Sequence, residues 1–572
     1  MRQFFTKLKA VCGIRLDDWR WFVQRLVGAS VVLQSLLPVT NAGDTSQLGF
    51  TARRNNVASP DDVPLVWNEE KSVKWSRLLG TQTNGSPVVA GGRVFIGTNN
   101  GAGGQQRYPR DIDRGVLLCI DEATGRLLWQ YSCEKLPTGK RHDWPEIGIC
   151  SAALVEADRL WFVSNRGEVV CLDVDGFMDE ENDGPVTDEE FAGIGEADVI
   201  WRLDMMKDLG VQQHNMANCS VTLSGNVLLV CTSNGIDRSH EQVAAPSAPS
   251  FLGLNKTTGC VIWTDNSPGK NILHGQWSSP AVGHMGGTIQ AVFAGGDGWL
   301  YSFDPRVNGS GGARLLWKFD CNSKESRWGD KPHFERNNII AMPVIHEGYV
   351  YVATGQTPDR GAGPGRLWCI DAAKNLDGAD VSDELAIAAD GQPLAHQRLQ
   401  AVDRAKGETV RRNPESASVW CYTGGDWNND GKLSYHERMH RSIGSVAVCD
   451  NLLIAVDTSG IVHCIDAGSG ASHWTYDTLC EAWASPLIVG NRVFVADADG
   501  WVSIFELAAD PQSAMQLSDG RLAKRARWEL GDVIHSTPTA SKGVLFVATQ
   551  KTLYALQLSQ QGYRLPKPIV AR

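Results

Sequence analysis

Short apolar stretches alternate with turns that contain Gly, Asn or Asp along almost the whole chain. GSPVVAGGRVFIGT from Gly85, CSVTLSGNVLLVCTS from Cys219 and ASPLIVGNRVFVADA from Ala484 each hold two alternating runs around such a turn. Period-two alternation with many β-branched residues predicts a pair of antiparallel strands. Five further copies begin at Cys150, Ser278, Ala341, Gly444 and Ser536.

A second phrase follows all but the last copy and ends in tryptophan. The clearest examples are LLCIDEATGRLLW, FLGLNKTTGCVIW and VHCIDAGSGASHW, each an apolar strand, a Thr-Gly or Ser-Gly turn and a second strand. Four of the seven intervals between successive tryptophans are 54 residues, so the chain is a repeat protein. The repeated tryptophans are Trp75, Trp129, Trp201, Trp263, Trp317, Trp420, Trp474 and Trp528.

Two strands from each phrase make one four-stranded unit, and the units number eight. The last unit, which ends with KTLYALQLS, has no Trp strand of its own, and VKWSRLLG (Val73 to Gly80) supplies it from the N-terminal side. The sequence therefore predicts an all-β fold, an eight-bladed β-propeller of four-stranded antiparallel blades whose ring is closed by an N-terminal strand. The tryptophans are expected to pack as apolar wedges between neighbouring blades.

The repeats leave short flanking regions. Residues 1–42 are predicted to be a signal peptide or N-terminal anchor, because a lead rich in Arg and Lys precedes an apolar run, Leu26 to Leu37, that is too short for a comfortable membrane span. Residues 43–69 are expected to be a linker, 70–560 the propeller, and 561–572 a C-terminal tail. Insertions are expected at about 175–198 and 372–439. We expect an exported protein, periplasmic or envelope-associated, and both cleavage and retention of the leader remain open.

Composition narrows the class of partner. The net charge is −11 over 572 residues and no extended basic cluster occurs, which argues against nucleic-acid binding. The 14 cysteines recur at fixed repeat positions, for example two residues before the Asp in LLCID and VHCID, so we expect mostly buried free thiols. Neither an adjacent cysteine pair nor a CxxCH haem motif occurs.

The repeated ID-x-x-TG-x-x-x-W phrase resembles the pyrroloquinoline quinone (PQQ) repeat. Eight such units over roughly residues 70 to 560 are similar to the quinoprotein alcohol dehydrogenase-like propellers, and segments such as HGQWSSP resemble the PQQ-binding-like propeller proteins of planctomycete-type bacteria. This propeller is shared by quinone-dependent dehydrogenases and by a non-catalytic lipoprotein of outer-membrane protein assembly. The resemblance therefore implies the fold and leaves the activity open.

Residues just before the innermost strand of each blade are expected to face the central funnel. Seven of the eight positions found in this way, among them Thr81 and Asn337, are polar, and the exception is Cys480. A solvated rim would be polar without any ligand. A funnel of carboxylates, amides, imidazoles and indoles offers partners for a planar quinone and a divalent cation. The candidate cofactor-binding residues are Glu146, Asn215, Asn218, His274, Trp277, His440, Arg441, Trp483, Asp532 and His535.

The resemblance also implies what an enzyme of this type would need. Such enzymes hold calcium between the quinone and a Glu/Asn/Asp set, and many stack the quinone on a disulfide of adjacent cysteines. The residues of this sequence that could form that set are Glu146, Asn215 or Asn218, and Asp532. The missing cysteine pair and haem motif mean that electrons would have to leave through a partner. Catalytic residues and enzyme status stay open.

One loop carries the spacing of a calcium site. DWNNDGKLSYHE fits the twelve-residue loop of EF-hand proteins, with Gly431 at the sharp turn. A polar surface insertion is the alternative, because no convincing helix precedes the loop. The predicted metal ligands are Asp426, Asn428, Asp430, Lys432 through its carbonyl, Ser434 and Glu437.

Three functions remain as hypotheses. The first is a binding or scaffold protein of the cell envelope with at least one calcium loop, whose funnel takes an unknown protein or small molecule. The second is a PQQ-dependent dehydrogenase that oxidises an alcohol or a sugar. The third is a polysaccharide-binding propeller that uses Trp277, Trp299 and Trp483 as stacking platforms. We expect a monomer that binds no nucleic acid.

Overall fold

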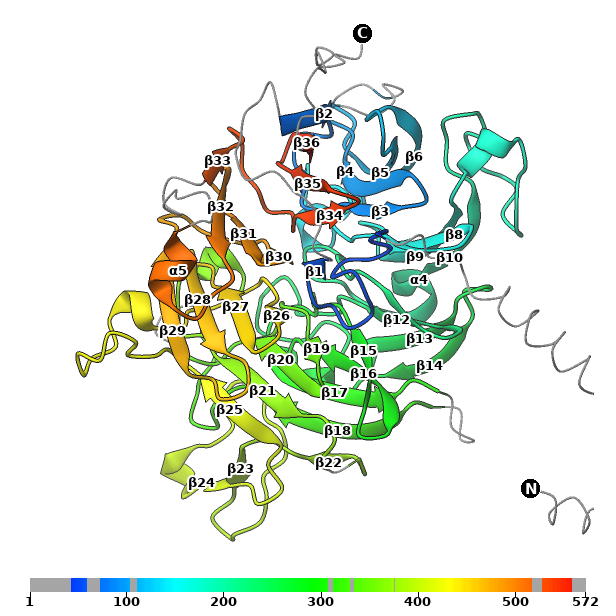
Figure 1. The fold of residues 1–572 in the computed structure, drawn as a ribbon. Coiled ribbons are helices and arrows are strands. Elements are labelled where there is room, and N and C mark those ends of the chain that lie inside the picture. Colours follow the sequence, from blue (N-terminus) through cyan, green and yellow to red (C-terminus); the bar gives the residue numbers. More distant parts are fainter. Residues whose placement is uncertain are drawn as a thin grey trace, which may run out of the picture. The chain divides into compact units, whose positions relative to one another are not determined.

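The described part of the chain is an eight-bladed β-propeller (Figure 1). The computed structural model describes residues 43–58, 72–102, 108, 111–306, 312–329, 334–374, 376–516 and 527–557. The chain divides into the units Met1–Ala42 and Gly43–Arg572, and every described element belongs to the second. The predicted leader and C-terminal tail lie outside the described residues, and no described helix has the length and apolar character to cross a membrane.

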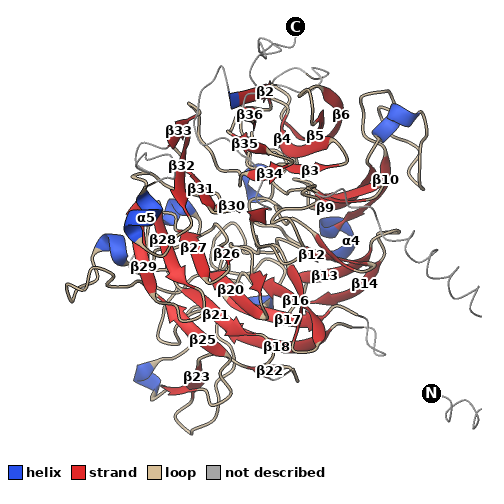
Figure 2. Cartoon of the chain, viewed as in Figure 1, coloured by secondary structure: helices blue, strands red, loops and turns tan. Residues whose placement is uncertain are grey.

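The four strands of each blade are antiparallel and follow chain order in blades 1 to 7, whereas blade 8 takes its fourth strand from the N-terminal side (Figure 2). Blade 1 holds β3 (Val88–Ala90), β4 (Arg93–Asn99), β5 (Arg114–Asp121) and β6 (Leu127–Glu134), and blade 2 holds β7 (Leu154–Glu156), β8 (Arg159–Val163), β9 (Glu168–Asp173) and β10 (Val199–Asp204). Blade 3 holds β11 (Thr222–Ser224), β12 (Val227–Cys231), β13 (Phe251–Asn255) and β14 (Val261–Asp265). Blade 4 holds β15 (Ala281–Met285), β16 (Thr288–Ala294), β17 (Trp299–Asp304) and β18 (Arg314–Asp320).

The second half of the ring repeats this pattern. Blade 5 holds β19 (Val344–His346), β20 (Tyr349–Ala353), β21 (Leu367–Asp371) and β25 (Ser418–Tyr422), and blade 6 holds β26 (Ala447–Cys449), β27 (Leu452–Val456), β28 (Ile461–Asp466) and β29 (Ser472–Asp477). Blade 7 holds β30 (Leu487–Val489), β31 (Arg492–Ala496), β32 (Trp501–Glu506) and β33 (Arg527–Glu529). Blade 8 holds β34 (Thr539–Ser541), β35 (Val544–Ala548) and β36 (Thr552–Leu556), and β2 (Val73–Leu78) completes it.

Strand β2 closes the ring as the sequence predicts. It pairs antiparallel with β36, with Trp75 opposite Ala555 and Leu78 opposite Thr552. The chain then continues from β2 into β3, so its first blade strand belongs to blade 8 and the following strands form blade 1, which joins the two ends of the ring.

The repeated tryptophans are buried between blades, which confirms the packing role expected of them. The indole of Trp129 in blade 1 donates a 3.0 Å hydrogen bond to the carbonyl of Val174 in blade 2, and Trp263 makes the equivalent bond from blade 3 to Pro305 in blade 4. Trp75 does the same from blade 8 to Glu122 in blade 1. Trp201, Trp420 and Trp474 make the same kind of bond to the next blade, whereas Trp317 bonds to Gln290 of its own blade. A buried indole N–H needs an acceptor, so most of these tryptophans join neighbouring blades by packing and by a hydrogen bond.

The recurring cysteines lie directly opposite these tryptophans. Cys119 pairs with Trp129 across β5 and β6, and Cys464 pairs with Trp474 across β28 and β29. In blade 3 the same position is Gly253, where an added Cβ would lie 2.2 Å from the Trp263 indole nitrogen. The described cysteines are free, and burial raises the pKa of most of their thiols. The tryptophan opposite therefore leaves room only for a small residue, and cysteine or glycine occupies this position in these blades.

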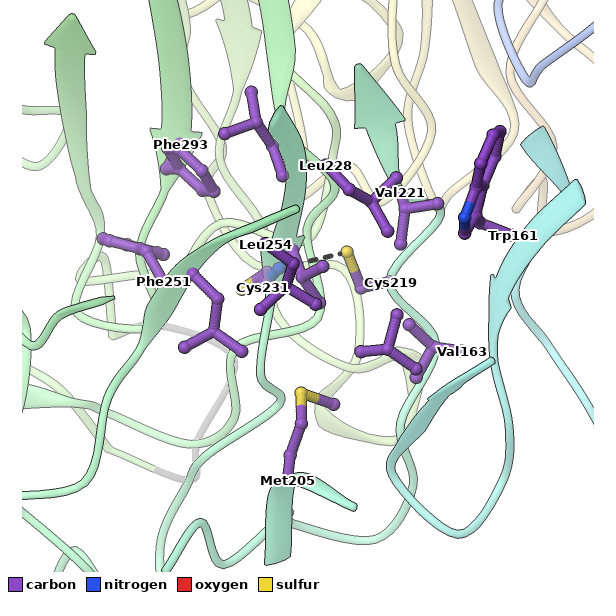
Figure 3. Packing of buried hydrophobic residues seen from close by; sticks show 14 of the residues in the cluster. Trp161, Val163, Met205, Cys219, Val221, Leu228, Cys231, Phe251, Leu254 and Phe293 are labelled. Atoms are coloured by element: carbon purple, nitrogen blue, oxygen red, sulfur yellow. Dashed lines mark hydrogen bonds between the residues drawn. The ribbon is translucent and has the colours of Figure 1, made fainter. Parts of the chain in front are cut away.

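The hydrophobic core is distributed between neighbouring blades. Figure 3 shows one part of it, in which Phe251 and Leu254 of β13 and Leu228 of β12 lie near Phe293 of β16. The small α4 (Met205–Leu209) places Met205 against the same cluster. The core therefore depends on contacts between blades, as expected for a repeat architecture.

Residues 43–58, which we call the N-terminal segment, contact all eight blades through the first strand of each. Thr45, Ser46 and Gln47 bond to blades 1, 2 and 3, and the later residues continue around the ring to blade 7, where β1 (Val57–Ala58) pairs parallel with β30. Figure 1 shows this dark-blue segment across the middle of the ring. The blade residues in these bonds are Val89, Val155, Thr222, Val282, Ile345, Val448, Ile488 and Ala540.

The sequence pattern predicts only a linker over residues 43–69. It does not indicate that residues 43–58 run in a fixed path along the blades. Arg54 is fully buried and donates hydrogen bonds to the carbonyls of Leu48, Ser220, Val221 and Pro280. Burial lowers the pKa of Arg54 to about 10. One guanidinium therefore ties the N-terminal segment to blades 3 and 4.

The first expected insertion, 175–198, lies between the third and fourth strands of blade 2, whereas the second, 372–439, includes the fourth strand of blade 5, β25, and part of the connection to blade 6. The first carries the 3₁₀ helix η2 (Gly176–Asp179) in blade 2. In the second, β22 (Ala379–Asp380) adds to blade 4 beside β18, and β23 (Glu384–Ile387) pairs with β24 (Thr409–Arg412). The remaining short elements are η1 (Gly139–Arg141), η3 (Gly269–Asn271), η4 (Pro358–Arg360), η5 (Arg404–Lys406), η6 (Tyr435–Glu437) and α5 (Pro511–Met515).

Candidate functional site

The candidate residues all lie on the face opposite the N-terminal segment. That face, here called the loop face, is formed by the connections from the fourth strand of each blade to the next blade, together with those between second and third strands. The ten predicted cofactor residues fall in six of the inter-blade connections. Each of these connections leads into the innermost strand of a blade. The expected position of the residues at the central funnel and their role in binding stay predictions.

The two predicted carboxylates are engaged separately. Glu146 accepts a 3.1 Å hydrogen bond from Gln82, and its left-handed backbone, with φ of 64°, is held by Asp113. Asp532 accepts from the backbone N–H of Lys551 at 3.1 Å and lies 3.6 Å from the Lys551 ammonium. Each carboxylate therefore already has a partner in its own part of the rim.

Arg441 and His440 lie in the connection between blades 5 and 6, and their side chains bond to neighbouring loops. The buried Arg441 guanidinium donates to the side chain of Asn337 and to the carbonyls of Phe334, Arg360 and Gly361. Burial lowers its pKa to about 10. With its donors bonded to neutral acceptors, Arg441 stabilises the connecting loops.

A buried carboxylate fixes His440. Asp457 accepts hydrogen bonds from the His440 backbone N–H at 3.0 Å and from its Nδ1 at 2.9 Å, and it lies 3.2 Å from Nε2 of His463. These bonds hold the pKa of Asp457 below its ordinary value even though burial opposes this. Asp457 and His463 are buried network members that the sequence analysis did not single out.

Trp483 and His535 stack on each other at the junction of blades 6, 7 and 8. Their ring centroids are 3.7 Å apart and their planes differ by 6°. Nδ1 of His535 lies 3.0 Å from the side-chain oxygen of Asn84, and burial lowers the pKa of His535 to about 4. The imidazole is neutral at pH 7 and covers one face of the indole.

The structure brings three histidines together near blades 3 and 4. His214 precedes β11, His240 lies in the connection between β12 and β13, and His274 precedes β15. One ring nitrogen from each lies within 4.8 Å of the others. His274 and its neighbour Trp277 were predicted as site residues, whereas His214 and His240 were not. Trp277 lies beside both buried imidazoles and donates to the carbonyl of His214 at 3.2 Å.

Burial keeps the two inner histidines neutral. It lowers the pKa of His214 to about 4 and that of His274 well below its ordinary value, and the nearby Arg360 adds to both effects. His214 and His274 approach each other through Nε2 at 3.0 Å. Neutral imidazole is the form that binds transition metals, so this cluster has the chemistry of a metal site.

A cavity of about 570 Å³ adjoins the histidines. The predicted residue Asn215 lines it, and the backbone of Asn215 bonds to Arg141 and Trp144. The lining contains three cationic side chains and no carboxylate, which favours an anionic ligand. Asn218 lies outside this lining and has a buried side-chain oxygen without a hydrogen-bond partner. The cavity is lined by Thr138, Lys140, Arg141, Trp144, His214, Asn215, Arg238 and His240.

A second buried network lies in blade 4 and was not predicted. Asp297 accepts a 2.6 Å hydrogen bond from the Tyr301 hydroxyl, and Nδ1 of His396 lies 3.5 Å away. Burial raises the pKa of Asp297 to about 7 and lowers that of His396 to about 3. His396 comes from the second insertion, so no local sequence signal relates it to Asp297.

The predicted calcium loop has part of the expected geometry. Asp426 accepts hydrogen bonds from the backbone N–H groups of Asp430 and Gly431, and Asn428 accepts from Asp430 at 2.8 Å. Glu437 is buried and bonds to the Ser434 N–H through one oxygen, while its other oxygen has no hydrogen-bond partner.

The loop is wider than a filled site. Within the described residues, the carboxylate oxygens of Asp426, Asp430 and Glu437 do not all lie within 4.8 Å of one another. The carbonyl of Lys432 stays a predicted ligand that rests on the spacing of the loop alone. The buried, half-bonded carboxylate of Glu437 is the feature that fits a cation, and closing the loop on calcium requires movement of the other ligands.

The described residues do not assemble the set that a calcium–quinone pair requires. Glu146 and Asp532 have separate partners, and neither belongs to a group of potential ligands within 4.8 Å of one another. The metal-like cluster on the loop face consists of imidazoles, whereas calcium prefers oxygen ligands. The residues present therefore do not fit a calcium–PQQ pair.

Two of the three proposed sugar-stacking tryptophans are wrong for that role. Trp277 and Trp299 are buried, so neither presents a ring face to solvent. Trp299 packs against His396 with ring centroids 4.8 Å apart. Trp277 packs against His214 and His274, so both indoles fill buried space.

The fold and its repeats define an eight-bladed propeller of the PQQ-repeat class. The family model described as outer membrane protein assembly factor BamB matches residues 197–413 and 395–559, more than half of the chain, and the chain belongs to this family. No curated protein sequence matches it.

Solved structures share the fold at low sequence identity. A europium-containing methanol dehydrogenase is 9% identical with a TM-score of 0.54, over 91% of this chain and 98% of its own. BamB from Moraxella catarrhalis is 13% identical with a TM-score of 0.45, over 85% and 98%. Quinohemoprotein alcohol dehydrogenase from Comamonas testosteroni is 10% identical with a TM-score of 0.44, over 92% and 82%. The dehydrogenase with the TM-score of 0.54 shows likeness of fold alone.

Proposed function

We propose that this protein is a non-enzymatic binding protein of the cell envelope that holds a partner polypeptide on its loop face. The observation that carries the proposal is an exposed apolar surface at blades 5 to 7, around a cavity of about 290 Å³. Leu479 is 82% exposed and Tyr435 is 51% exposed at this cavity. Large apolar side chains exposed together are typical of protein-binding surfaces.

The fixed N-terminal segment leaves this surface accessible. Gly43 accepts a hydrogen bond from Ser541 at the end of β34, and Thr45 pairs with Val89 of β3, so the described chain begins on the face opposite the loops. The predicted leader and the family's description as an outer membrane protein assembly factor support an envelope location.

The calcium loop forms one edge of the same surface. Leu433 and Tyr435 are exposed and lie inside the twelve-residue loop, and Tyr435 also lines the cavity. We propose that calcium closes the loop on Glu437 and thereby holds Tyr435 in place for the partner. A cation that neutralises a buried carboxylate favours the closed form because the unpaired oxygen gains a ligand.

Terbium luminescence tests the calcium loop. Trp427 lies within the loop and is expected to sensitise a bound terbium ion, and calcium is expected to compete it away. Asp426→Ala should abolish the emission, whereas Asp390→Ala, an exposed carboxylate elsewhere in the insertion, should leave it unchanged. Equal emission from both variants would contradict calcium binding at this loop.

Site-specific photocrosslinking in the native host tests the binding surface. A photoreactive residue at position 479 should give one discrete adduct with a second protein. The control position is Tyr349, which is partly exposed at the opposite face and should give none. Tyr435→Ser should weaken the adduct from position 479. Absence of an adduct at position 479 would overturn the proposal.

A dye-reduction assay with PQQ, calcium, alcohols and sugars addresses the competing enzyme hypothesis. The proposal predicts no turnover above that of the protein without PQQ. Quinone-dependent turnover would overturn it and would make Glu146, Asn215 and Asp532 the first residues to replace.

A further inference from the structure

Three loops of blades 2 to 4 converge on the three histidines. The His214 backbone N–H donates to Ser233, and the Ile236 N–H donates to the carbonyl of His274 at 2.9 Å, so the connection between β12 and β13 is bonded to both neighbours. An added Cβ on Gly235 would lie 2.6 Å from the Cβ of His214 and from the His274 carbonyl. The convergence therefore depends on close backbone packing.

The orientation of His214 fixes which nitrogen is available. Its Nδ1 lies 2.9 Å from the carbonyl of Ile236, and a carbonyl only accepts hydrogen bonds, so the proton is on Nδ1. The Nε2 lone pair then points at His274, whose Nε2 is 3.0 Å away. A histidine held by a backbone carbonyl through its other nitrogen is the usual arrangement of a metal ligand.

The spacing of the rings also suits a shared metal. Two imidazole nitrogens on one tetrahedral zinc ion, at bond lengths of about 2.0–2.1 Å, are separated by about 3.3 Å. The 3.0 Å between the inner histidines needs only a small adjustment to reach that value. His240 is exposed, and its ring centroid lies 5.0 Å from that of His214 and 5.4 Å from that of His274. It closes the third side of the cluster.

We infer that His214, His240 and His274 form a binding site for a divalent transition metal, with a fourth position that takes an anion from the adjoining cavity. Three imidazoles and one open position make an incomplete tetrahedral site. Lys140, Arg141 and Arg238 line the cavity and oppose the binding of a bare cation. An anion bound to the metal offsets this repulsion.

The first experiment measures zinc bound by the full-length protein after dialysis. The wild type should hold one equivalent more than His240→Ala, with affinity at this site reduced at least about 100-fold in the variant. His240 is exposed, so its loss leaves the core intact, and His240→Cys should restore zinc because thiolate is also a zinc ligand. His284→Ala, an exposed histidine on β15, is the matched control and should bind zinc like the wild type. Equal zinc in His240→Ala and the wild type would overturn the metal site.

The second experiment tests the anion. Azide added to the cobalt-loaded protein at constant ionic strength should change the visible spectrum of the metal. Arg238→Ala should weaken azide binding about two- to fivefold, as expected for loss of one exposed charge. An unchanged spectrum on azide addition would overturn the open fourth position, and equal azide affinity in Arg238→Ala would overturn the role of the cationic lining.

Discussion

Replacement of Arg54 by methionine tests whether the N-terminal segment stabilises the ring. Methionine keeps most of the apolar length of arginine and removes every donor. Arg53, its neighbour in sequence, is exposed, and Arg53→Met is therefore the matched control. The two variants differ only in which of two adjacent arginines is lost.

The structure gives the size of the expected effect. Four carbonyl oxygens lose a charged donor, and hydrogen bonds of this kind contribute about 1.5 kcal/mol each at the lower end of their range. Burial lowers the pKa of Arg54 to about 10, so removal of the charge returns about 3 kcal/mol. The balance is a loss of about 3 kcal/mol for Arg54→Met, against less than about 0.5 kcal/mol for the exposed control.

Guanidinium chloride unfolding followed by tryptophan fluorescence measures this difference. The midpoint for Arg54→Met should fall clearly below that of the wild type, and that for Arg53→Met should not. Hydrogen exchange should accelerate in residues 43–58 and in the first strand of blade 3, which the guanidinium joins. Identical midpoints for the two variants, with unchanged slopes, would refute the reasoning that Arg54 holds the segment on the ring.

Three further changes test the packing and the buried groups. Gly259→Ala should lower the thermal unfolding temperature more than Gly210→Ala. Both glycines have φ near 70°, but only the Cβ added at Gly259 would lie 2.5 Å from the Trp201 ring. Equal losses in the two variants would contradict this packing argument. The carboxyl pKa of Asp297 is raised to about 7 in the fold, so the native state loses up to about 4 kcal/mol of stability as the pH rises from about 4 to 7. Asp297→Asn should remove this loss from the stability measured against pH. A pH profile identical to that of the wild type would contradict the raised pKa. Cys260 is exposed among the described cysteines, so Cys260→Ser should remove most of the fast reaction of the native protein with a thiol reagent, and persistence of that reaction would contradict the assignment.

The blade architecture could be predicted because its signals are local. Strand alternation, the Thr-Gly turn and the terminal tryptophan all occur within one repeat, and the ring closure follows from counting which strand the last repeat lacks. The predicted burial of Trp129 and the predicted free thiol of Cys119 are confirmed. Both could be predicted because the two residues face each other across adjacent strands. Their positions are fixed by a single hairpin.

The candidate site could be predicted only in part. Positions before each inner strand identified the loop face and included His274, but not the histidines that accompany it. His240 lies in the middle of a connection between strands, where no repeat position marks it, and it meets His214 only because Gly235 allows the loops to pack closely. His396 reaches Asp297 from an insertion about 100 residues away in sequence.

The sequence by itself determined the repeat, the number of blades, the closing strand and the roles of the tryptophans and cysteines. Only the tertiary structure decided that residues 43–58 run around the inner strands, that Arg54 rather than Arg53 is buried, and that three histidines converge. The physical reason is the range of the interactions. Hairpins and turns record their pairing in neighbouring residues, whereas Thr45 meets Ala540 and Asn55 meets Val448 only after the ring has closed.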